Sequence, residues 1–285
     1  MKKGILSLSI IAFIIAGCNE KPDFEPYRDV DICFTVDSVP NSLLKLAASS
    51  TEKAITKIIL LGVEGQNVRK LHETTGNPGS IKLTISKTIT ALYAIANPSP
   101  TLETAIPSTL TNLNNLTNTF GNSMPQPNFL MSGSVTLSSG VTSISINLVR
   151  VVARVDIRGA NGFVISSVTV QNTPSQGYVF SKTPFVVPSG VANYNAVSTS
   201  ATPTLYVTEN TNTNATNSTK FLVSGRLNSG STTQYTVELK SNGQYINIVR
   251  NSYYLVTITP KTEIEYTIQV TIPEWSDVIT DPYEF

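Results

Sequence analysis

Residues 141–157 read VTSISINLVRVVARVDI, and apolar and polar side chains alternate along most of this stretch. Ile144, Ile146 and Leu148 recur at every second position, which places them on one face of an extended chain. A second apolar run follows directly, from residue 149 to residue 157. Because the whole stretch is long for one strand, we expect it to contain the junction between two domains, near residue 148.

Outward from this stretch, most of the chain consists of further short strand candidates separated by Gly, Asn and Pro turns. The candidates are residues 31–38, 55–63, 80–88, 91–96, 129–133, 164–170, 177–180, 204–208, 221–227, 234–239, 252–259 and 266–272. Many short strands at hairpin spacing, with almost no helical period, favour β-sandwiches. The sequence therefore predicts an all-β chain with two β-sandwich domains, residues 46–147 and 148–285.

Few segments predict anything other than strand. Leu110, Leu113 and Leu116 recur every third residue, but the Thr and Asn residues around them are poor helix formers, so we expect a short helix at most. Residues 38–53 contain Pro40 and Asn41 and predict a loop, as does the polar stretch 211–219.

The composition limits the classes of function. Charged residues make up 14% of the chain, below the usual ~25%. The net charge is +1, so no basic face for nucleic acid is expected. The two cysteines, Cys18 and Cys33, exclude a disulfide framework if Cys18 carries lipid. Cys33 falls on the strand face opposite Ile32 and Phe34, and we interpret it as a small spacer.

The N-terminus predicts export. Lys2 and Lys3 precede an apolar run from residue 5 to residue 15, which is too short to span a bilayer. The run ends in IAGC at residues 15–18, which resembles the bacterial lipobox. We expect residues 1–17 to be a signal peptide cleaved between Gly17 and Cys18, with lipid such as palmitate on Cys18. The alternative is an ordinary signal peptide with a chance cysteine.

The sequence offers little catalytic chemistry. His72 is the single histidine and lies in a polar segment flanked by Gly, Asn and Pro, which predicts a solvated loop residue. No zinc site, Ser-His-Asp elbow or phosphate loop can be assembled, so we expect neither an enzyme nor a cofactor. Tyr253, Tyr254 and Trp275 could stack on sugars, but packing in or beside the cores is the favoured interpretation.

Taken in order, several motifs resemble the fimbrillins, the type V pilins of Bacteroidetes. They are the lipobox, the strands at 31–38 and 57–63, FLMSG (129–133), LVRVVARV (148–155), VTVQN (168–172), LYVTEN (205–210), RNSYYLV (250–256) and IPEW (272–275). The resemblance covers essentially the whole chain. It implies two transthyretin-like β-sandwiches and a structural role in a fimbria or pilus that supports cell adhesion, at the outer membrane and cell surface.

The resemblance also implies how such subunits assemble. A trypsin-like protease removes the first strand after an Arg or Lys, and a neighbouring subunit's C-terminal strand fills the groove, which is β-augmentation. Here the removed segment would be residues 18–45, with the apolar row Ile32, Phe34 and Val36, and the cut would fall between Lys45 and Leu46. Lys53 is the second choice, whereas Arg28 is expected to precede the strand. The partners would be other fimbrial subunits and surface receptors.

The donor strand would come from the C-terminal tail. Its candidate residues are Trp275, Val278, Ile279, Tyr283 and Phe285. They do not alternate cleanly, and Pro282 cannot donate a ladder hydrogen bond. Two alternatives therefore stay open: an anchor subunit that keeps its lipid and first strand, and an outer-membrane lipoprotein that binds glycans.

Overall fold

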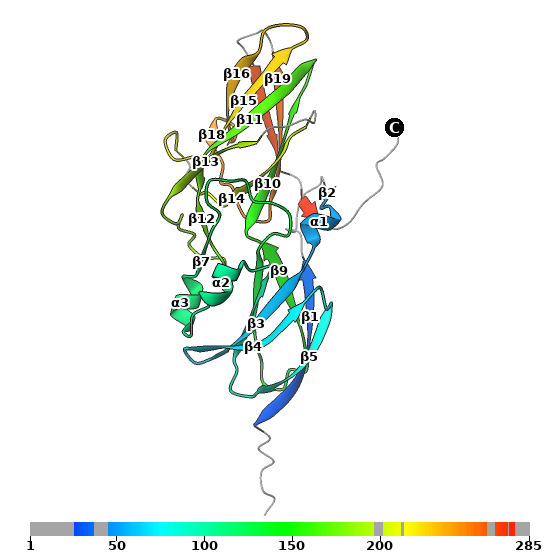
Figure 1. Cartoon of the computed structure of the whole chain (residues 1–285), viewed down its shortest axis with the longest axis vertical. Coiled ribbons are helices and arrows are strands. Elements are labelled where there is room, and N and C mark those ends of the chain that lie inside the picture. Colours follow the sequence, from blue (N-terminus) through cyan, green and yellow to red (C-terminus); the bar gives the residue numbers. More distant parts are fainter. Residues whose placement is uncertain are drawn as a thin grey trace, which may run out of the picture.

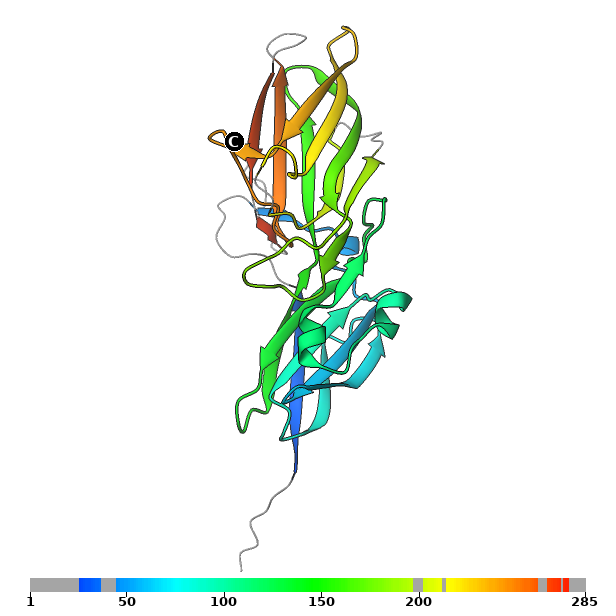
Figure 2. The ribbon, with the colours of Figure 1, turned by 90° about the vertical axis from the view of Figure 1, so that its left-hand side faces the viewer.

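The computed structural model describes residues 26–36, 45–196, 202–211, 214–260, 266–272 and 274–276. In these residues strand dominates and three helices are short, so the all-β prediction is confirmed. Figures 1 and 2 show two β-rich lobes stacked along the long axis of the molecule. The chain passes between them where β9 (Ser143–Arg150) continues through Val151 into β10 (Val152–Gly159).

The N-terminal lobe is a seven-stranded sheet in the order β4-β3-β6-β8-β9-β1-β5. The other strands are β1 (Tyr27–Val36), β3 (Lys57–Glu64), β4 (Asn67–Thr75), β5 (Ser80–Ser86), β6 (Ala91–Ala96) and β8 (Met131–Thr136). Leu60 of β3 and Ile85 of β5 lie near opposite ends of this order, yet they share one buried core. The sheet therefore curls over and encloses that core between its two halves.

Strand β3 is buried on both faces, which explains its unbroken apolar run. Ile58 and Leu60 face the enclosed core, whereas Ile59 and Leu61 face a second cluster under two helices, α2 (Pro100–Thr104) and α3 (Leu110–Asn114). Ser99 and Thr109 cap these helices through their hydroxyls. The short helix predicted around residue 110 is confirmed.

The C-terminal lobe is a sandwich of two four-stranded sheets, β14-β10-β19-β20 and β13-β11-β15-β16. Its remaining strands are β11 (Phe163–Pro174), β13 (Val191–Ala196), β14 (Thr204–Thr208), β15 (Lys220–Leu227), β16 (Thr233–Glu238), β19 (Tyr253–Pro260) and β20 (Tyr266–Thr271). One continuous core fills the space between the sheets, with Val155, Val223 and Val256 each fully buried. Inward-facing residues of both sheets supply this core, as expected for a sandwich.

Short strands add further pairings, two of which join segments distant in sequence. The pairs are β7 (Thr117–Thr119) with β12 (Gln176–Tyr178), β17 (Lys240–Ser241) with β18 (Gln244–Tyr245), and β2 (Lys45–Ala47) with β21 (Glu274–Ser276). Helix α1 (Ser50–Lys53) follows β2 directly. Within the described ranges, no helix has the length and apolar character needed to cross a membrane.

Several sequence predictions are wrong in detail. Residues 38–53 are not all loop, because β2 and α1 lie within them. His72 lies in a strand, β4, and not in a loop; the polar sequence of β4 did not predict a strand, but β4 pairs with β3. Arg28 lies inside β1 instead of preceding it. Strand β13 was not predicted at all.

Candidate functional site

Strand β1 lies inside the N-terminal sheet instead of at its edge. Residues 31–36 pair in parallel with residues 143–148 of β9, and residues 27–33 pair antiparallel with residues 80–86 of β5. We call the space between β9 and β5 the β1 slot. The slot is filled by a segment from the start of the chain, while both of its walls come from later strands (Figure 1).

The side chains of β1 alternate between core and solvent. Val30 and Ile32 are fully buried and Phe34 is nearly so, whereas Asp31 and Cys33 are exposed. The row Ile32, Phe34 and Val36 thus faces the core and is extended by Val30. Burying such a side chain contributes about 1.5–3 kcal/mol. Without β1, the slot would expose apolar core and two unpaired sheet edges.

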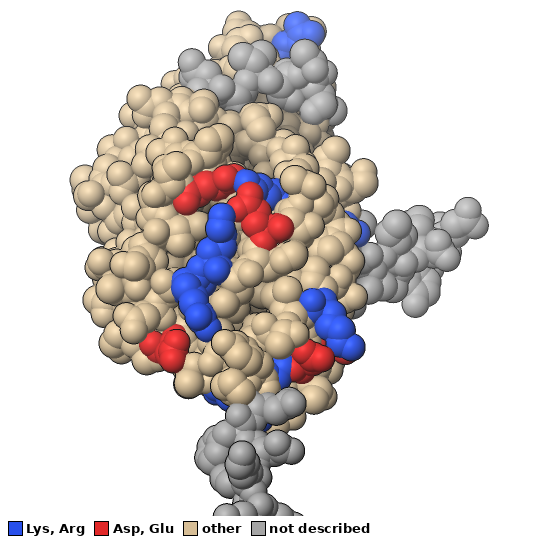
Figure 3. All heavy atoms as spheres, turned by 60° about the horizontal axis from the view of Figure 1, so that its bottom comes forward, with Lys and Arg blue, Asp and Glu red and all other residues tan. Residues whose placement is uncertain are grey.

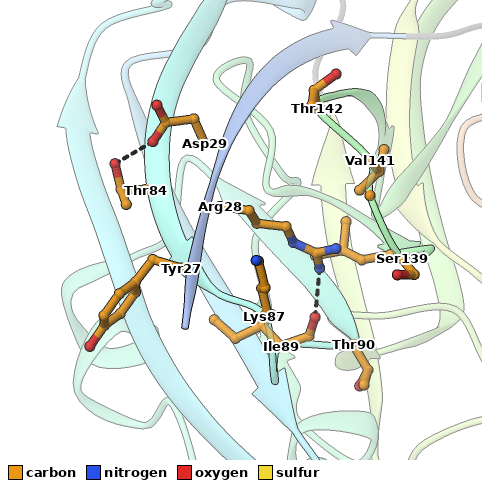
Figure 4. Close-up of a pocket in the computed structure, with 12 residues that line it drawn as sticks. Tyr27, Arg28, Asp29, Thr84, Lys87, Ile89, Thr90, Ser139, Val141 and Thr142 are labelled. Atoms are coloured by element: carbon orange, nitrogen blue, oxygen red, sulfur yellow. Dashed lines mark hydrogen bonds between the residues drawn. The ribbon is translucent and has the colours of Figure 1, made fainter. Parts of the chain in front are cut away.

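The outer end of the slot is held by Arg28. Its guanidinium donates through Nη1 to the carbonyl of Ser138 and through Nη2 to that of Ile89, both at 2.9 Å. These carbonyls belong to the turns that follow β8 and β5, so Arg28 ties the start of β1 to both of these turns. Figure 4 shows the bond to Ile89. The main-chain N–H of Lys87 also donates to the carbonyl of Pro26.

A hollow of about 670 Å³, lined by both polar and apolar side chains, lies at this end of β1. Figure 3 views the molecule from the end of the N-terminal lobe and shows basic and acidic side chains interspersed on this face. Tyr27, Arg28 and Asp29 of β1 form part of its wall, and Asp29 is engaged by the Thr84 hydroxyl at 2.6 Å. The hollow is thus the mouth of the slot, and its shape depends on β1.

At the inner end, the chain leaves β1 at Val36 and is described again from Lys45. Strand β2 pairs in parallel with β21, with Lys45 opposite Glu274 and Leu46 opposite Trp275. The predicted cut between Lys45 and Leu46 therefore falls in a paired strand, not in a loop. Gly17, Cys18 and the tail residues Val278, Ile279, Tyr283 and Phe285 lie outside the described residues.

A buried charged cluster lies beside this segment, at the junction of the lobes. Glu52 of α1 is 1% exposed. Its carboxylate accepts from Nη1 of Arg154 at 3.0 and 3.2 Å, from the Tyr206 hydroxyl at 2.7 Å and from the Ser49 N–H at 2.5 Å. Arg154 also forms a two-point ion pair with Asp156, at 3.0 and 2.8 Å. We call Glu52, Arg154, Asp156 and Tyr206 the junction cluster.

Glu52 and Arg154 of the junction cluster are both charged at neutral pH. Burial raises the pKa of Glu52, but the Ser49 N–H, the Tyr206 hydroxyl and Arg154 outweigh burial and hold this pKa below its usual value. Burial lowers the pKa of Arg154, yet Asp156 and Glu52 bring it above its usual value. Burial and the bond to Glu52 raise the pKa of Tyr206, so its hydroxyl keeps the proton that it donates.

Sequence reasoning missed the junction cluster, although two signals were present. Ser49 and Glu52 have the spacing of a capping box, which the structure forms. Arg154 and Asp156 are two positions apart on a strand and therefore share a face. Neither signal indicates that these two segments meet.

The remaining candidate residues have structural roles. Tyr253 and Tyr254 are 3% and 1% exposed, so the packing interpretation is confirmed for these two residues, and neither offers a ring to sugars. The side chain of Trp275 lies outside the described part of the chain. Cys33 is exposed and unpaired, on the face predicted for it. Among the described residues, no group of His, Cys, Asp and Glu is arranged to hold a metal ion.

Comparison with known proteins places this fold. No protein-family model matches the sequence, and no curated protein sequence matches it significantly. A candidate cell-adhesion protein from Bacteroides eggerthii superposes with a TM-score of 0.63 at 13% identity, covering 88% of this chain and 97% of that one. The tip fimbrial protein Mfa3 from Porphyromonas gingivalis, with a C-terminal truncation, gives 0.60 at 15% identity, covering 87% and 100%. A fimbrilin from Porphyromonas gingivalis gives 0.56 at 14% identity, covering 89% and 98%.

These three neighbours are named for fimbriae or for cell adhesion. The superpositions span nearly the full length of each neighbour, so both lobes are shared. The chain therefore has the fold of Bacteroidetes fimbrial and adhesion proteins, and the resemblance seen in its motifs is confirmed at the level of the fold.

Proposed function

We propose that this chain is a structural subunit of a cell-surface fimbria that supports adhesion. It is exported as a lipoprotein through Cys18 and polymerises by strand exchange after residues 18–45 are removed. The observation that carries the proposal is the position of β1. This strand fills a slot in the core of the N-terminal lobe, yet it belongs to the beginning of the chain and no described strand precedes it.

The slot supports exchange because β9 and β5 bind β1 largely through main-chain hydrogen bonds, which do not depend on the sequence of the bound strand. Main-chain hydrogen bonds to β9 and β5 are available to any extended chain, and the sites of Val30, Ile32 and Phe34 select alternate apolar side chains. The tail of another subunit, with Val278 and Ile279, is the proposed occupant. Other fimbrial subunits are therefore the proposed partners, at the outer surface of the cell.

The proposal is tested by cutting the chain before β2. A recognition sequence for a specific protease is inserted after Pro40 in a Cys18→Ser chain that lacks residues 1–17. We expect the uncut protein to remain monomeric in size-exclusion chromatography and the cut protein to form polymers as β1 leaves. Deleting residues 278–285 is the matched control and should abolish the polymers. Cut protein that loses β1 and stays monomeric would contradict the proposal.

One observation favours a second candidate, an anchor subunit that keeps its lipid and β1. Lys45 lies in β2, which is paired with β21, and proteases bind unpaired extended segments. The N-terminus of protein from assembled fibres distinguishes the two candidates. Leu46 at the N-terminus supports the polymerising subunit, whereas lipid-modified Cys18 on all of the material supports the anchor.

A further inference from the structure

We propose that Glu52 acts as a clasp that fixes where excision ends, so that residues 46–53 stay on the C-terminal lobe after β1 is removed. This inference rests on the proposed function, because it concerns the same processing event. It assigns a role to the junction cluster, which no step of strand exchange uses. The clasp thus holds the segment that directly follows the proposed cut after Lys45.

The sequence after β1 offers three successive lysines to a trypsin-like protease. Lys45 lies in β2, Lys53 is the last residue of α1, and Lys57 opens β3. Lys57 is protected because β3 is paired on both sides and its ammonium contacts Glu73 and Glu103 at 2.6 and 2.7 Å. The choice of cutting site is therefore between Lys45 and Lys53.

Lys53 follows the clasp directly. Cutting after it requires several residues on each side to become extended, so α1 must unwind and Glu52 must leave its site. The side chain and the main-chain carbonyl of Glu52 both oppose this unwinding. Its carboxylate is held by Arg154 and Tyr206, and its carbonyl accepts from Nε of the fully buried Arg150 at 2.9 Å. Removing a buried carboxylate from such partners is strongly unfavourable.

Lys45 lies seven residues before Glu52 and is attached more weakly. Its segment is held by a three-residue pairing between β2 and β21, which a protease can displace without disturbing Glu52. After a cut at Lys45, Leu46 and Ala47 can pair again with Trp275 and Ser276. The clasp would thus keep a partner strand in place for β21, which leads into the proposed donor tail.

The test is limited trypsin digestion of the Cys18→Ser chain that lacks residues 1–17, with product N-termini read by mass spectrometry. Wild type should accumulate a product that begins at Leu46 and persists. Glu52→Gln should convert it to a product that begins at Ala54 about tenfold faster, since an ionic hydrogen-bond acceptor is lost. Glu238→Gln, at a carboxylate of the C-terminal lobe that also pairs with lysines, Lys220 and Lys240, is the matched control and should behave as wild type.

Tyr206→Phe removes one hydrogen bond from the clasp and keeps the ring, so it serves if Glu52→Gln fails to fold. Its conversion rate should lie between those of wild type and Glu52→Gln. Equal conversion rates in all four proteins, or a first cut of wild type at Lys53, would overturn the clasp. If wild type resists trypsin throughout residues 37–53, that result counts against excision, and the clasp is then judged by amide exchange. Exchange at residues 50–54 must rise about tenfold in Glu52→Gln, and unchanged exchange would overturn the clasp.

Discussion

Strands β1 and β10 occupy matching places in the two lobes but are held in different ways. Each is the first sheet strand of its lobe, and each lies inside a sheet. Each pairs in parallel with a later strand on one side, β9 or β19, and antiparallel with another strand on the other side, β5 or β14. Their pairing topology therefore does not distinguish them.

The difference lies in their faces and their connections. β1 buries one face, and its end at Val36 leads into a segment that carries the proposed cutting site. β10 is buried on both faces along most of its length and carries Arg154 and Asp156 of the junction cluster. It also continues from β9 through the single residue Val151. We infer that a strand inside a sheet can be exchanged only if one of its faces is exposed to solvent and one of its ends can be released from the rest of the lobe.

The largest expected effect comes from placing a carboxylate in each strand. Ile32 of β1 and Val155 of β10 are both fully buried. We expect Val155→Asp to unfold the C-terminal lobe, with a loss of about 4 kcal/mol or more, because β10 cannot leave. Ile32→Asp should instead release β1, with faster amide exchange confined to β1 and the strands that flank it. Denaturant unfolding and hydrogen exchange measure the two outcomes.

Cys33→Asp is the matched control for β1, because its side chain is exposed. We expect a change within about 0.5 kcal/mol. The comparison breaks down if Ile32→Asp unfolds both lobes together, since β1 would then be as permanent as β10.

The next effect concerns the charges on β10. Arg154→Met should lower the free energy of unfolding by about 3–5 kcal/mol, because it leaves Glu52 and Asp156 buried without their partner. Arg158→Met on the same strand is the control, since Arg158 is exposed and bonds a threonine hydroxyl. A loss below 1 kcal/mol for Arg154→Met would mean that the junction cluster does not hold β10.

How far the sequence predicts this molecule can be seen from these same strands. The alternation of Ile32, Phe34 and Val36 predicted both the strand and its buried face, because local period determines which side chains share a face. The unbroken apolar run of β3 likewise predicted a buried strand. The order of the strands was not predictable from any local pattern, because the pairing of β1 with β9 joins residues more than 100 positions apart.

The errors share a physical cause. The polar strand β4 and the short strand β2 owe their form to partners, β3 and β21, and not to their own apolar period. The junction cluster depends on Glu52 meeting Arg154, which are 102 positions apart. Polar contacts across such separations leave no periodic trace in the sequence.

A smaller effect is expected at the mouth of the slot. Arg28→Met removes two hydrogen bonds to the carbonyls of Ser138 and Ile89, and we expect a loss of about 1–2 kcal/mol. Amide exchange should increase in β1 and remain unchanged in β10. Lys82→Met is the control, because its contact with Asp31 is exposed and long, at 4.0 Å. Equal exchange in Arg28→Met and wild type would show that Arg28 does not help to retain β1.

The smallest effect is the pH dependence of stability that Glu52 of the junction cluster contributes. The pKa of Glu52 in the folded chain lies below its ordinary value of 4.5, so the unfolded chain binds its proton first as the pH falls. The stability that ionised Glu52 contributes is therefore complete above about pH 4.5 and is lost as the pH drops through the lowered pKa.

We expect the difference in unfolding free energy between wild type and Glu52→Gln to be constant near neutral pH and to shrink below pH 4.5. Glu73 and Glu238 also have lowered pKa values, but both proteins carry them, so their contributions cancel in the difference. Denaturant titrations of both proteins at several pH values measure this difference in unfolding free energy. A difference that stays constant into strong acid would show that the negative charge of Glu52 is not what holds α1 to β10.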